Sequence, residues 1–177
     1  MDQANPSGWV RRFAPLIRAG GRVLDLAAGA GRHTRLLLDM GFAVTAVDRD
    51  AAALQPLAGP HCEVREIDLE GGEGWRPVGG YDAVVVANYL YRPLLPPIAA
   101  ALAADGILIY ETFMAGNERF GRPRNPDFLL RPGELLEAFA PLTVIAFEQG
   151  EVTRPRPAMV QRLAAINGRP GALPEPV

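Results

Sequence analysis

The sequence predicts a doubly wound α/β domain whose central sheet has seven strands and is mainly parallel. Short apolar runs alternate with segments of helical length, and successive runs are too far apart to be joined as hairpins. Right-handed crossovers between parallel strands, with helices on both faces of the sheet, follow from this order. The last two runs are joined by a loop alone, residues 148–158, which predicts an antiparallel strand at the edge of the sheet.

Each predicted strand is a short run rich in aliphatic and β-branched residues, and most predicted helices end near Gly or Pro. We place strands at residues 22–26, 42–47, 62–67, 83–87, 107–113, 142–147 and 159–166. We place helices at residues 9–17, 32–40, 51–57, 94–104 and 132–139. In this Rossmann-like arrangement, residues 21–167 form one domain and residues 168–177 a flexible tail. Residues 1–20 form an N-terminal segment whose helix either acts as a lid or only covers the sheet.

Composition excludes several classes of protein. The 177 residues suffice for one well-buried domain, and a net charge of −2 argues against nucleic acid or an anionic membrane as a partner. All 18 basic residues are Arg, which excludes Schiff-base chemistry on Lys and the Gly-Lys-Ser/Thr phosphate loop. Cys62 is the single cysteine, and the sequence shows no leader and no run of membrane-spanning length. We expect a cytoplasmic, soluble monomer or homodimer without a bound metal.

The stretch from residue 22 to residue 34 combines a strand, a Gly-rich turn and the start of a helix. Gly29 and Gly31 leave the turn open to a ligand, and the helix that begins near Arg32 presents free N–H groups and a partial positive charge. Ligands of doubly wound sheets bind at the carboxyl ends of the strands, next to the point where the strand order reverses. This rule brings together seven residues: Asp25, Gly29, Gly31, Asp48, Asp68, Asn88 and Glu111.

Two carboxylates at this edge suit a nucleoside. Asp48 follows Gly31 by 17 residues, close to the spacing at which an acidic residue binds the hydroxyls of a ribose. Asp68 could accept a hydrogen bond from the amine of adenine, with Leu69 beside the ring, although either aspartate alone could simply cap a helix or turn. The Gly-x-Gly-x-x-Gly pattern of dinucleotide-binding proteins is incomplete, because Thr34 stands at its third glycine. A nicotinamide-nucleotide-binding domain therefore stays an alternative to a domain that binds S-adenosylmethionine.

Four segments, in the same order along the chain, resemble the motifs of the class I S-adenosylmethionine-dependent methyltransferases. They are Val-Leu-Asp-Leu-Ala-Ala-Gly-Ala-Gly-Arg at 23–32, Val47-Asp48, Ile67-Asp68-Leu69 and Tyr81-Asp82-Ala83-Val84. The resemblance extends from about residue 9 to residue 167 and departs from the family at Ala27, where a glycine is usual. A closer resemblance, to the tellurite-resistance-type branch, rests on Gly31-Arg32-His33, Asp68-Leu69 and Pro132-Gly133-Glu134-Leu135.

The resemblance implies S-adenosylmethionine as the cofactor and gives the residues of this edge their roles. Asp25 would orient the amino group of the methionine part, directly or through water. Gly29 and Gly31 would let the cofactor lie against the backbone. Arg32 either pairs with the methionine carboxylate or is exposed on the helix, and His33 is expected on the helix surface. The expected cofactor-binding residues are Asp25, Ala27, Gly29, Gly31, Arg32, Asp48, Arg49, Asp68, Leu69 and Asn88.

Methyl transfer from a sulfonium is an in-line displacement, which depends on alignment rather than on a catalytic triad. A neutral hydroxyl or amine acceptor would also need a general base, for which Glu111, Tyr89 and Tyr91 are the candidates. Each candidate has a structural alternative. The two tyrosines could form the wall of a pocket, and Glu111 could be hydrogen-bonded to a neighbouring loop.

The long connection between residues 114 and 131 carries Arg119, Arg122 and Arg124. These arginines either receive a carboxylate or phosphate of the acceptor or form a solvated loop. We therefore predict an S-adenosylmethionine-dependent methyltransferase that acts on a small molecule. The alternatives are a nicotinamide-nucleotide-binding domain and a non-catalytic protein that binds S-adenosylmethionine.

Overall fold

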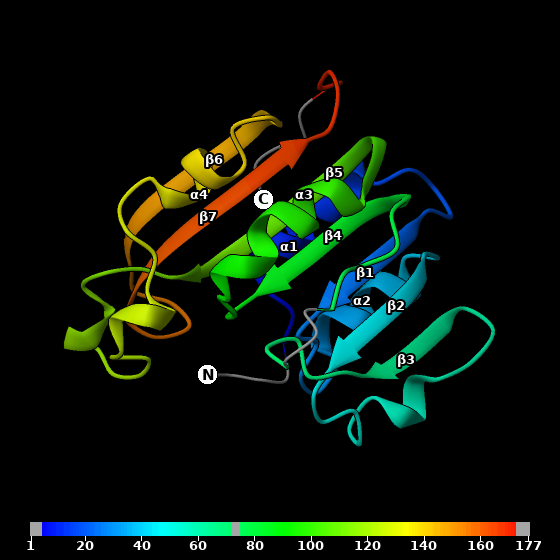
Figure 1. The fold of residues 1–177 in the computed structure, drawn as a ribbon, viewed down its shortest axis with the longest axis horizontal. Helices are drawn as coiled ribbons and strands as arrows, with labels where there is room; N and C mark the ends of the chain where they lie inside the picture. Colours follow the sequence, from blue (N-terminus) through cyan, green and yellow to red (C-terminus); the bar gives the residue numbers. More distant parts are fainter. Residues whose placement is uncertain (1–4, 72–74, 173–177) are drawn as a thin grey trace.

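The structure, a computed structural model, describes residues 5–71 and 75–172. A seven-stranded sheet with the strand order β3-β2-β1-β4-β5-β7-β6 forms its centre (Figure 1). The strands are β1 (Arg22–Leu26), β2 (Ala43–Asp48), β3 (Cys62–Glu66), β4 (Tyr81–Ala87), β5 (Leu102–Phe113), β6 (Thr143–Val152) and β7 (Ala158–Ile166). Strands β1 to β5 pair in parallel, whereas β7 is antiparallel to both of its neighbours. The predicted doubly wound, mainly parallel sheet is confirmed, and its antiparallel strand lies one position in from the edge.

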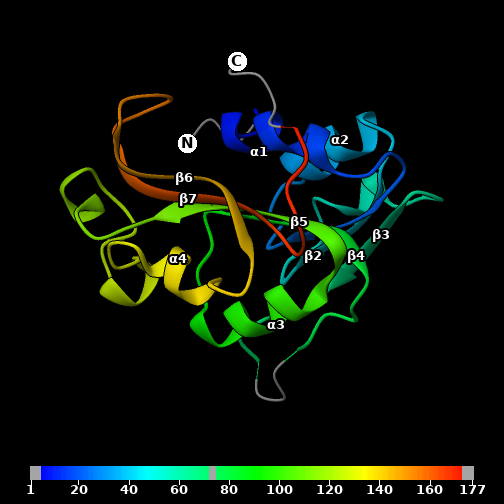
Figure 2. The ribbon, with the colours of Figure 1, turned by 90° about the horizontal axis from the view of Figure 1, so that it is seen from above.

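Helices cover both faces of this sheet (Figure 2). Helices α1 (Gly8–Phe13) and α2 (Arg32–Asp39) lie on one face, and α3 (Leu95–Ala101) and α4 (Glu134–Ala138) lie on the other. Short 3-10 helices occupy Ala14–Leu16, Gln55–Leu57, Arg92–Leu94, Asn117–Arg119 and Pro126–Phe128. Successive side chains of a strand point to opposite faces, so each face has its own apolar layer. Leu24 and Val84 belong to the layer beneath α3 and α4, and Val23 and Val85 belong to the layer beneath α1 and α2.

All five predicted helices are shorter in the structure, and for two of them the reason is plain. The helix predicted at residues 51–57 is a turn followed by the 3-10 helix Gln55–Leu57, because Pro56 lies inside this segment and provides no N–H for a longer helix. The helix predicted to reach residue 104 ends at Ala101, because Leu102 already pairs with Tyr81 in the sheet.

Strand β6 is longer than predicted. It continues to Val152 instead of ending at residue 147, because it pairs with β7 along its whole length. The burial pattern could not show this extension, since most of β6 is partly or fully exposed. The hairpin that β6 and β7 form therefore projects beyond the parallel part of the sheet (Figure 1).

The predicted N-terminal helix is α1 followed by a 3-10 turn at Pro15. The Ser7 hydroxyl caps α1 by accepting the Trp9 backbone N–H at 3.0 Å. Trp9 and Phe13 are buried with their rings 4.6 Å apart, and the Trp9 indole N–H donates to the Leu163 carbonyl at 3.3 Å. Helix α1 therefore covers the sheet beside β7, while its opening as a lid stays a prediction.

The described residues include only part of the predicted N-terminal segment and of the predicted tail. Residues 1–4 of the predicted N-terminal segment and residues 173–177 of the predicted tail lie outside the described residues, and residues 168–172 are exposed. Across residues 5–71 and 75–172, no helix is long and apolar enough to cross a membrane. The division of the chain into residues 1–20, 21–167 and 168–177 stays a prediction.

Candidate functional site

The loop between β1 and α2 passes over the end of the sheet through three residues with positive φ, namely Ala27 (53°), Gly29 (56°) and Gly31 (76°). The two glycines have different surroundings. A Cβ on Gly31 would lie 2.8 Å from the Leu57 side chain and 2.9 Å from the Leu54 side chain, so this position has no room for one. A Cβ on Gly29 would meet nothing within 4 Å. Gly29 therefore faces open space, where its backbone is accessible to a ligand.

Ala27 holds a backbone conformation that favours glycine. Its φ of 53° lies in the left-handed region, which costs a residue with a Cβ roughly 1–2 kcal/mol. The residue is half-buried and packs against the apolar layer beneath α3. An alanine at this position is thus held in a strained backbone conformation.

Asp48 ends β2 directly beside this loop. One of its carboxylate oxygens accepts the Gly29 N–H at 2.7 Å, and the other accepts the Asp50 N–H at 3.1 Å. A carboxylate oxygen has two lone pairs, so both oxygens can still accept a hydrogen bond from a hydroxyl. Asp48 therefore closes a turn and at the same time offers acceptors for a diol at the open loop.

Asp68 and Leu69 follow β3 at the neighbouring strand end. Asp68 is exposed and accepts the Glu70 N–H at 3.0 Å, so it also closes a turn while keeping free lone pairs. Leu69 is buried in the apolar layer beneath α3. Arg49, next to Asp48, is exposed and forms no hydrogen bond or ion pair within the described part of the chain. The roles predicted for these residues toward a nucleoside stay predictions.

Asp25 lies inside the domain rather than on its surface. It is 1% exposed, and the Thr34 hydroxyl donates to its carboxylate at 2.6 Å. Burial raises the pKa of Asp25 to about 6, against the opposing effect of the hydrogen bonds from Thr34. Asp25 thus supports the first turn of α2. At this depth, its predicted contact with a methionine amino group would have to pass through water or through Thr34.

The prediction that His33 lies on the helix surface is wrong. His33 is 3% exposed, and its Nε2 atom accepts the Ser7 backbone N–H at 3.1 Å, because the segment ahead of α1 folds over the start of α2. Burial lowers the pKa of His33 to about 3, so the ring is neutral at neutral pH. Arg32 is half-buried and donates to the Asn5 carbonyl at 3.3 Å. Its predicted pairing with a methionine carboxylate stays a prediction.

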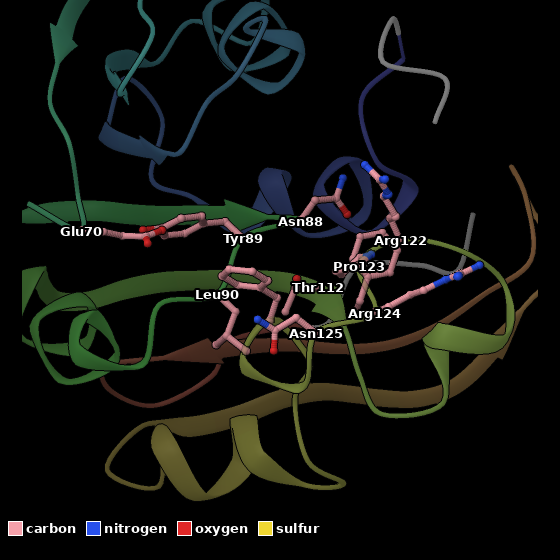
Figure 3. Close-up of a pocket in the computed structure, with 11 residues that line it drawn as sticks. Glu70, Asn88, Tyr89, Leu90, Thr112, Arg122, Pro123, Arg124 and Asn125 are labelled. Carbon is pink, nitrogen blue, oxygen red and sulfur yellow. The ribbon is translucent and has the colours of Figure 1, made fainter.

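A pocket of about 600 Å³ opens at the carboxyl ends of β4 and β5 (Figure 3). One wall consists of residues 88–90 and 112–113 at the two strand ends, and the other consists of residues 122–125 and Phe128 of the long connection. Glu70 lies at one end of the pocket (Figure 3). Among the predicted site residues, Asn88 and Tyr89 line this pocket. Its volume is in the range of sites for small molecules.

The two candidate tyrosines lie in different surroundings. The Tyr89 hydroxyl is buried, and the Glu70 carboxylate lies beside it (Figure 3). Burial and the nearby carboxylates of Glu70 and Asp68 raise the pKa of Tyr89, so its hydroxyl is protonated at neutral pH. A protonated phenol can donate a hydrogen bond to a ligand, but it is a poor base. Tyr91 is half-buried beside the apolar layer beneath α3 and does not line the pocket.

Glu111 does not line the pocket. The next two residues of β5, Thr112 and Phe113, do line it. The Glu111 carboxylate accepts the Arg162 Nε–H at 3.1 Å, and Arg162 also donates to Glu148 at 3.4 Å. With 8% of its surface exposed, Glu111 joins β5 to β7. The geometry supports this structural alternative, and the role of general base stays a prediction.

The residues that fix the outer wall of the pocket were not predicted. Arg92 donates to both carboxylate oxygens of Glu134, at 2.7 and 3.0 Å, and to the carbonyls of Asp127 and Leu129, at 2.8 and 2.9 Å. Burial alone would raise the pKa of Glu134. The hydrogen bonds from Arg92 and from the Arg131 backbone N–H, with the charges of both arginines, instead bring it below its usual range.

Asn117 holds the other end of the long connection. It is 2% exposed, donates to the Pro123 carbonyl at 3.3 Å and accepts the Met159 N–H at 3.2 Å. The partners of Arg92 and Asn117 are up to 42 residues away along the chain. No local pattern in the sequence marks such contacts. An arginine directly after a predicted strand end, with no acidic residue nearby in sequence, is the weak signal that could have identified Arg92.

Comparison with known proteins identifies the fold. No protein-family model matches the sequence. The structure superposes on TehB from Haemophilus influenzae with a TM-score of 0.72 over 91% of this chain and 62% of that protein, at 17% identity. It superposes on the Burkholderia thailandensis 1,6-didemethyltoxoflavin-N1-methyltransferase, with bound 1,6-didemethyltoxoflavin and S-adenosylhomocysteine, with a TM-score of 0.68 over 91% of this chain and 76% of that one, at 24% identity. The chain has the class I methyltransferase fold.

A curated methyltransferase is similar in sequence to part of this chain. Protein-L-isoaspartate O-methyltransferase 1 from Rhodopseudomonas palustris (strain HaA2) is 37% identical over 101 residues, which cover 52% of this chain and 40% of the relative. The chain thus spans less than half of the curated relative and about three fifths of TehB. The resemblance to the class I methyltransferases is confirmed as one of fold, and TehB is an example from the predicted branch.

Proposed function

We propose that this protein is an S-adenosylmethionine-dependent methyltransferase that transfers a methyl group in line to a small-molecule acceptor. The observation that carries this proposal is the combination of an open Gly29 with free acceptor lone pairs on Asp48 at one part of the sheet edge and a pocket of about 600 Å³ at the neighbouring part. Two adjoining sites are what a reaction between a nucleoside cofactor and a second substrate requires. The shared fold supports the proposal but does not decide the activity.

The residues present fit S-adenosylmethionine. Asp48 would hold the ribose hydroxyls, Asp68 the adenine amine, and the open backbone at Gly29 the amino-acid part. When bound, this cofactor supplies a methyl group that is already activated by the positive sulfur. The protein then contributes alignment and the exclusion of water, which are worth up to roughly 7–11 kcal/mol in favourable intramolecular cases. In the transfer, a lone pair of the acceptor atom forms the new bond to carbon as the carbon–sulfur bond breaks.

The size of the pocket favours a small acceptor. Residues 122–125 and Phe128 form a wall opposite the strand ends, which leaves room for a molecule of modest size. The curated relative is named for a protein substrate, but its similarity covers only 52% of this chain. We therefore propose a small molecule rather than a protein as the acceptor.

Calorimetry of the purified protein with S-adenosylhomocysteine and with NADH tests the proposed cofactor. We expect S-adenosylhomocysteine to bind and NADH not to bind, and the reverse result would assign the site to nicotinamide nucleotides. Transfer of a labelled methyl group from S-adenosylmethionine to a library of small molecules then tests the activity. Binding without transfer to any of them would leave a non-catalytic S-adenosylmethionine-binding protein.

A further inference from the structure

Two arginines of the long connection lie on the pocket wall without a partner. Arg122 and Arg124 line the pocket, and neither forms a hydrogen bond or ion pair within the described residues. Arg119, three residues before Arg122, is different. Its guanidinium contacts Glu151 at 3.8 Å, donates to the Gly116 carbonyl at 3.2 Å and does not line the pocket. Arg122 and Arg124 are exposed, and their side chains project outward from the rim of the pocket (Figure 3). Of the three arginines considered from the sequence, two thus lie where they can meet a ligand that enters the pocket.

The backbone between these two arginines is anchored by a hydrogen bond from Asn117. The Asn117 side chain donates to the carbonyl of Pro123, the residue between them, and its own carbonyl is bonded to the Met159 N–H. A guanidinium is always charged and presents a planar fork that matches the two oxygens of a carboxylate or phosphate. Two such groups at the rim of the pocket, on a backbone that is anchored from the sheet, offer two cationic forks to an anion that enters it.

The pocket is polarised along its length. Glu70 lies at the end opposite Arg122 and Arg124 (Figure 3). Between these ends the lining is largely apolar and includes Leu90 and Phe113. An anionic group is attracted to the arginine end and repelled from the carboxylate end, so a ligand with one charged group has one preferred orientation.

We propose that the methyl acceptor is a small organic acid whose anionic group, a carboxylate or a phosphate, is bound by Arg122 and Arg124. Its apolar body lies between these arginines and the end of β4, and its reacting end points toward Asn88 and Tyr89. The proposal deepens the proposed function, on which it rests, by assigning the chemical class of the acceptor and the residues that determine specificity. The protonated Tyr89 hydroxyl lies beside the Glu70 carboxylate, at the end of the pocket that takes the uncharged end of such a ligand.

Matched ligands test the proposal on the full chain. We expect benzoate or phenyl phosphate to bind at least tenfold more tightly than the neutral isostere benzamide in calorimetry. Replacing Arg122 or Arg124 by Gln should weaken the binding of the acid about tenfold, the lower end of what a hydrogen bond to a charged group contributes, and should leave benzamide unaffected. If only phenyl phosphate shows this preference, the site selects phosphate, and if only benzoate shows it, the site selects carboxylate.

Arg119→Gln is the matched control, because it removes the same charge from the same connection outside the pocket. We expect it to bind the acids as the unmodified protein does. Equal binding of benzamide and the acids, no binding of either acid at millimolar concentration, or an equal loss in Arg119→Gln would overturn the proposal.

A separate measurement distinguishes this proposal from the proposed function. S-adenosylhomocysteine should bind the Arg122→Gln and Arg124→Gln variants with the affinity of the unmodified protein. Binding of the cofactor product without any preference for acids would overturn the acceptor class alone. A preference for acids in a protein that does not bind S-adenosylhomocysteine would overturn the methyltransferase proposal and retain the anion site.

Discussion

The two parts of the sheet edge are built in different ways. At the ends of β1 and β2, the Asp48 carboxylate accepts hydrogen bonds from backbone N–H groups, from Gly29 at 2.7 Å and from Asp50 at 3.1 Å. At the ends of β4 and β5, the pocket wall depends on side chains that bond to distant parts of the chain, as Arg92 does to Glu134. The first part is specified by a local motif, and the second by contacts between elements. Changes in the contacts behind the pocket wall should therefore act on stability, and changes at the ends of β1 and β2 on the affinity for the cofactor.

Arg92→Leu is expected to have the largest effect. It leaves the Glu134 carboxylate, 5% exposed, without its charged partner. Breaking a buried pair costs about 3–5 kcal/mol, and because the Arg92 side chain is 37% exposed we expect a loss near the lower end, about 3 kcal/mol. Urea unfolding at neutral pH measures it.

Arg131→Leu is the control for this prediction, because the Arg131 side chain also contacts Glu134, at 3.6 Å, but is 70% exposed. An exposed pair contributes about 0–1 kcal/mol. Equal losses in the two variants would show that the buried network does not fix the wall. Because the pKa of Glu134 is lowered in the folded protein, the stability that it contributes is present at neutral pH and is lost as the pH falls through that lowered pKa.

Asp48→Ala should lower the affinity for the cofactor product and leave the wall of the pocket intact. It removes the carboxylate that would hold the ribose, so we expect the binding of S-adenosylhomocysteine to weaken by about 1.5–3 kcal/mol, the contribution of hydrogen bonds to a charged group. Asp39→Ala, at the exposed end of α2, is the control. Unchanged affinity in calorimetry would remove Asp48 from the cofactor site.

The shifted pKa values of His33 and Asp25 lead us to expect an unusual dependence of stability on pH. Burial lowers the pKa of His33 from 6.5 to about 3, so its contribution to stability decreases as the pH falls between these values. Burial raises the pKa of Asp25 from 3.8 to about 6, so its contribution increases as the pH falls between those values. Each effect amounts to at most about 1.4 kcal/mol per pH unit. In the unmodified protein the two should cancel between about pH 4 and pH 6.

His33→Gln removes one side of this balance. We expect the stability of this variant to increase as the pH is lowered from 6 to 4, in urea unfolding at a series of pH values. His61→Gln, at the other histidine, which is exposed, should keep the flat profile of the unmodified protein. A flat profile in His33→Gln would contradict the prediction.

Glu111→Gln should have the smallest effect on stability, about 1 kcal/mol, because the amide can still accept the hydrogen bond from Arg162. If Glu111 only joins β5 to β7, methyl transfer and cofactor affinity are unchanged. If it is the general base, turnover falls while cofactor affinity stays the same. Single-turnover kinetics with labelled S-adenosylmethionine separates the two outcomes.

The sheet and the first half of its edge could be predicted from the sequence because their signals are local. Strand and helix lengths set the topology, and Gly29, Gly31 and Asp48 lie at positions that follow directly from it. The burial of His33 could not be predicted, because it depends on where Ser7 lies on α2. The hydrogen-bond partner of Glu111 could not be predicted either, because it is Arg162, 51 residues later in the chain.

The contact between the segment ahead of α1 and the start of α2 has a practical consequence for producing the protein. Ser7 and Asn5 are bonded to His33 and Arg32, right next to the glycine turn. A tag fused just ahead of Asn5 would be tethered beside the proposed cofactor site, whereas one fused after residue 172 would extend from the exposed residues 168–172. Screening for ligands should therefore use carboxyl-terminal tags, with a cleaved amino-terminal version as the comparison.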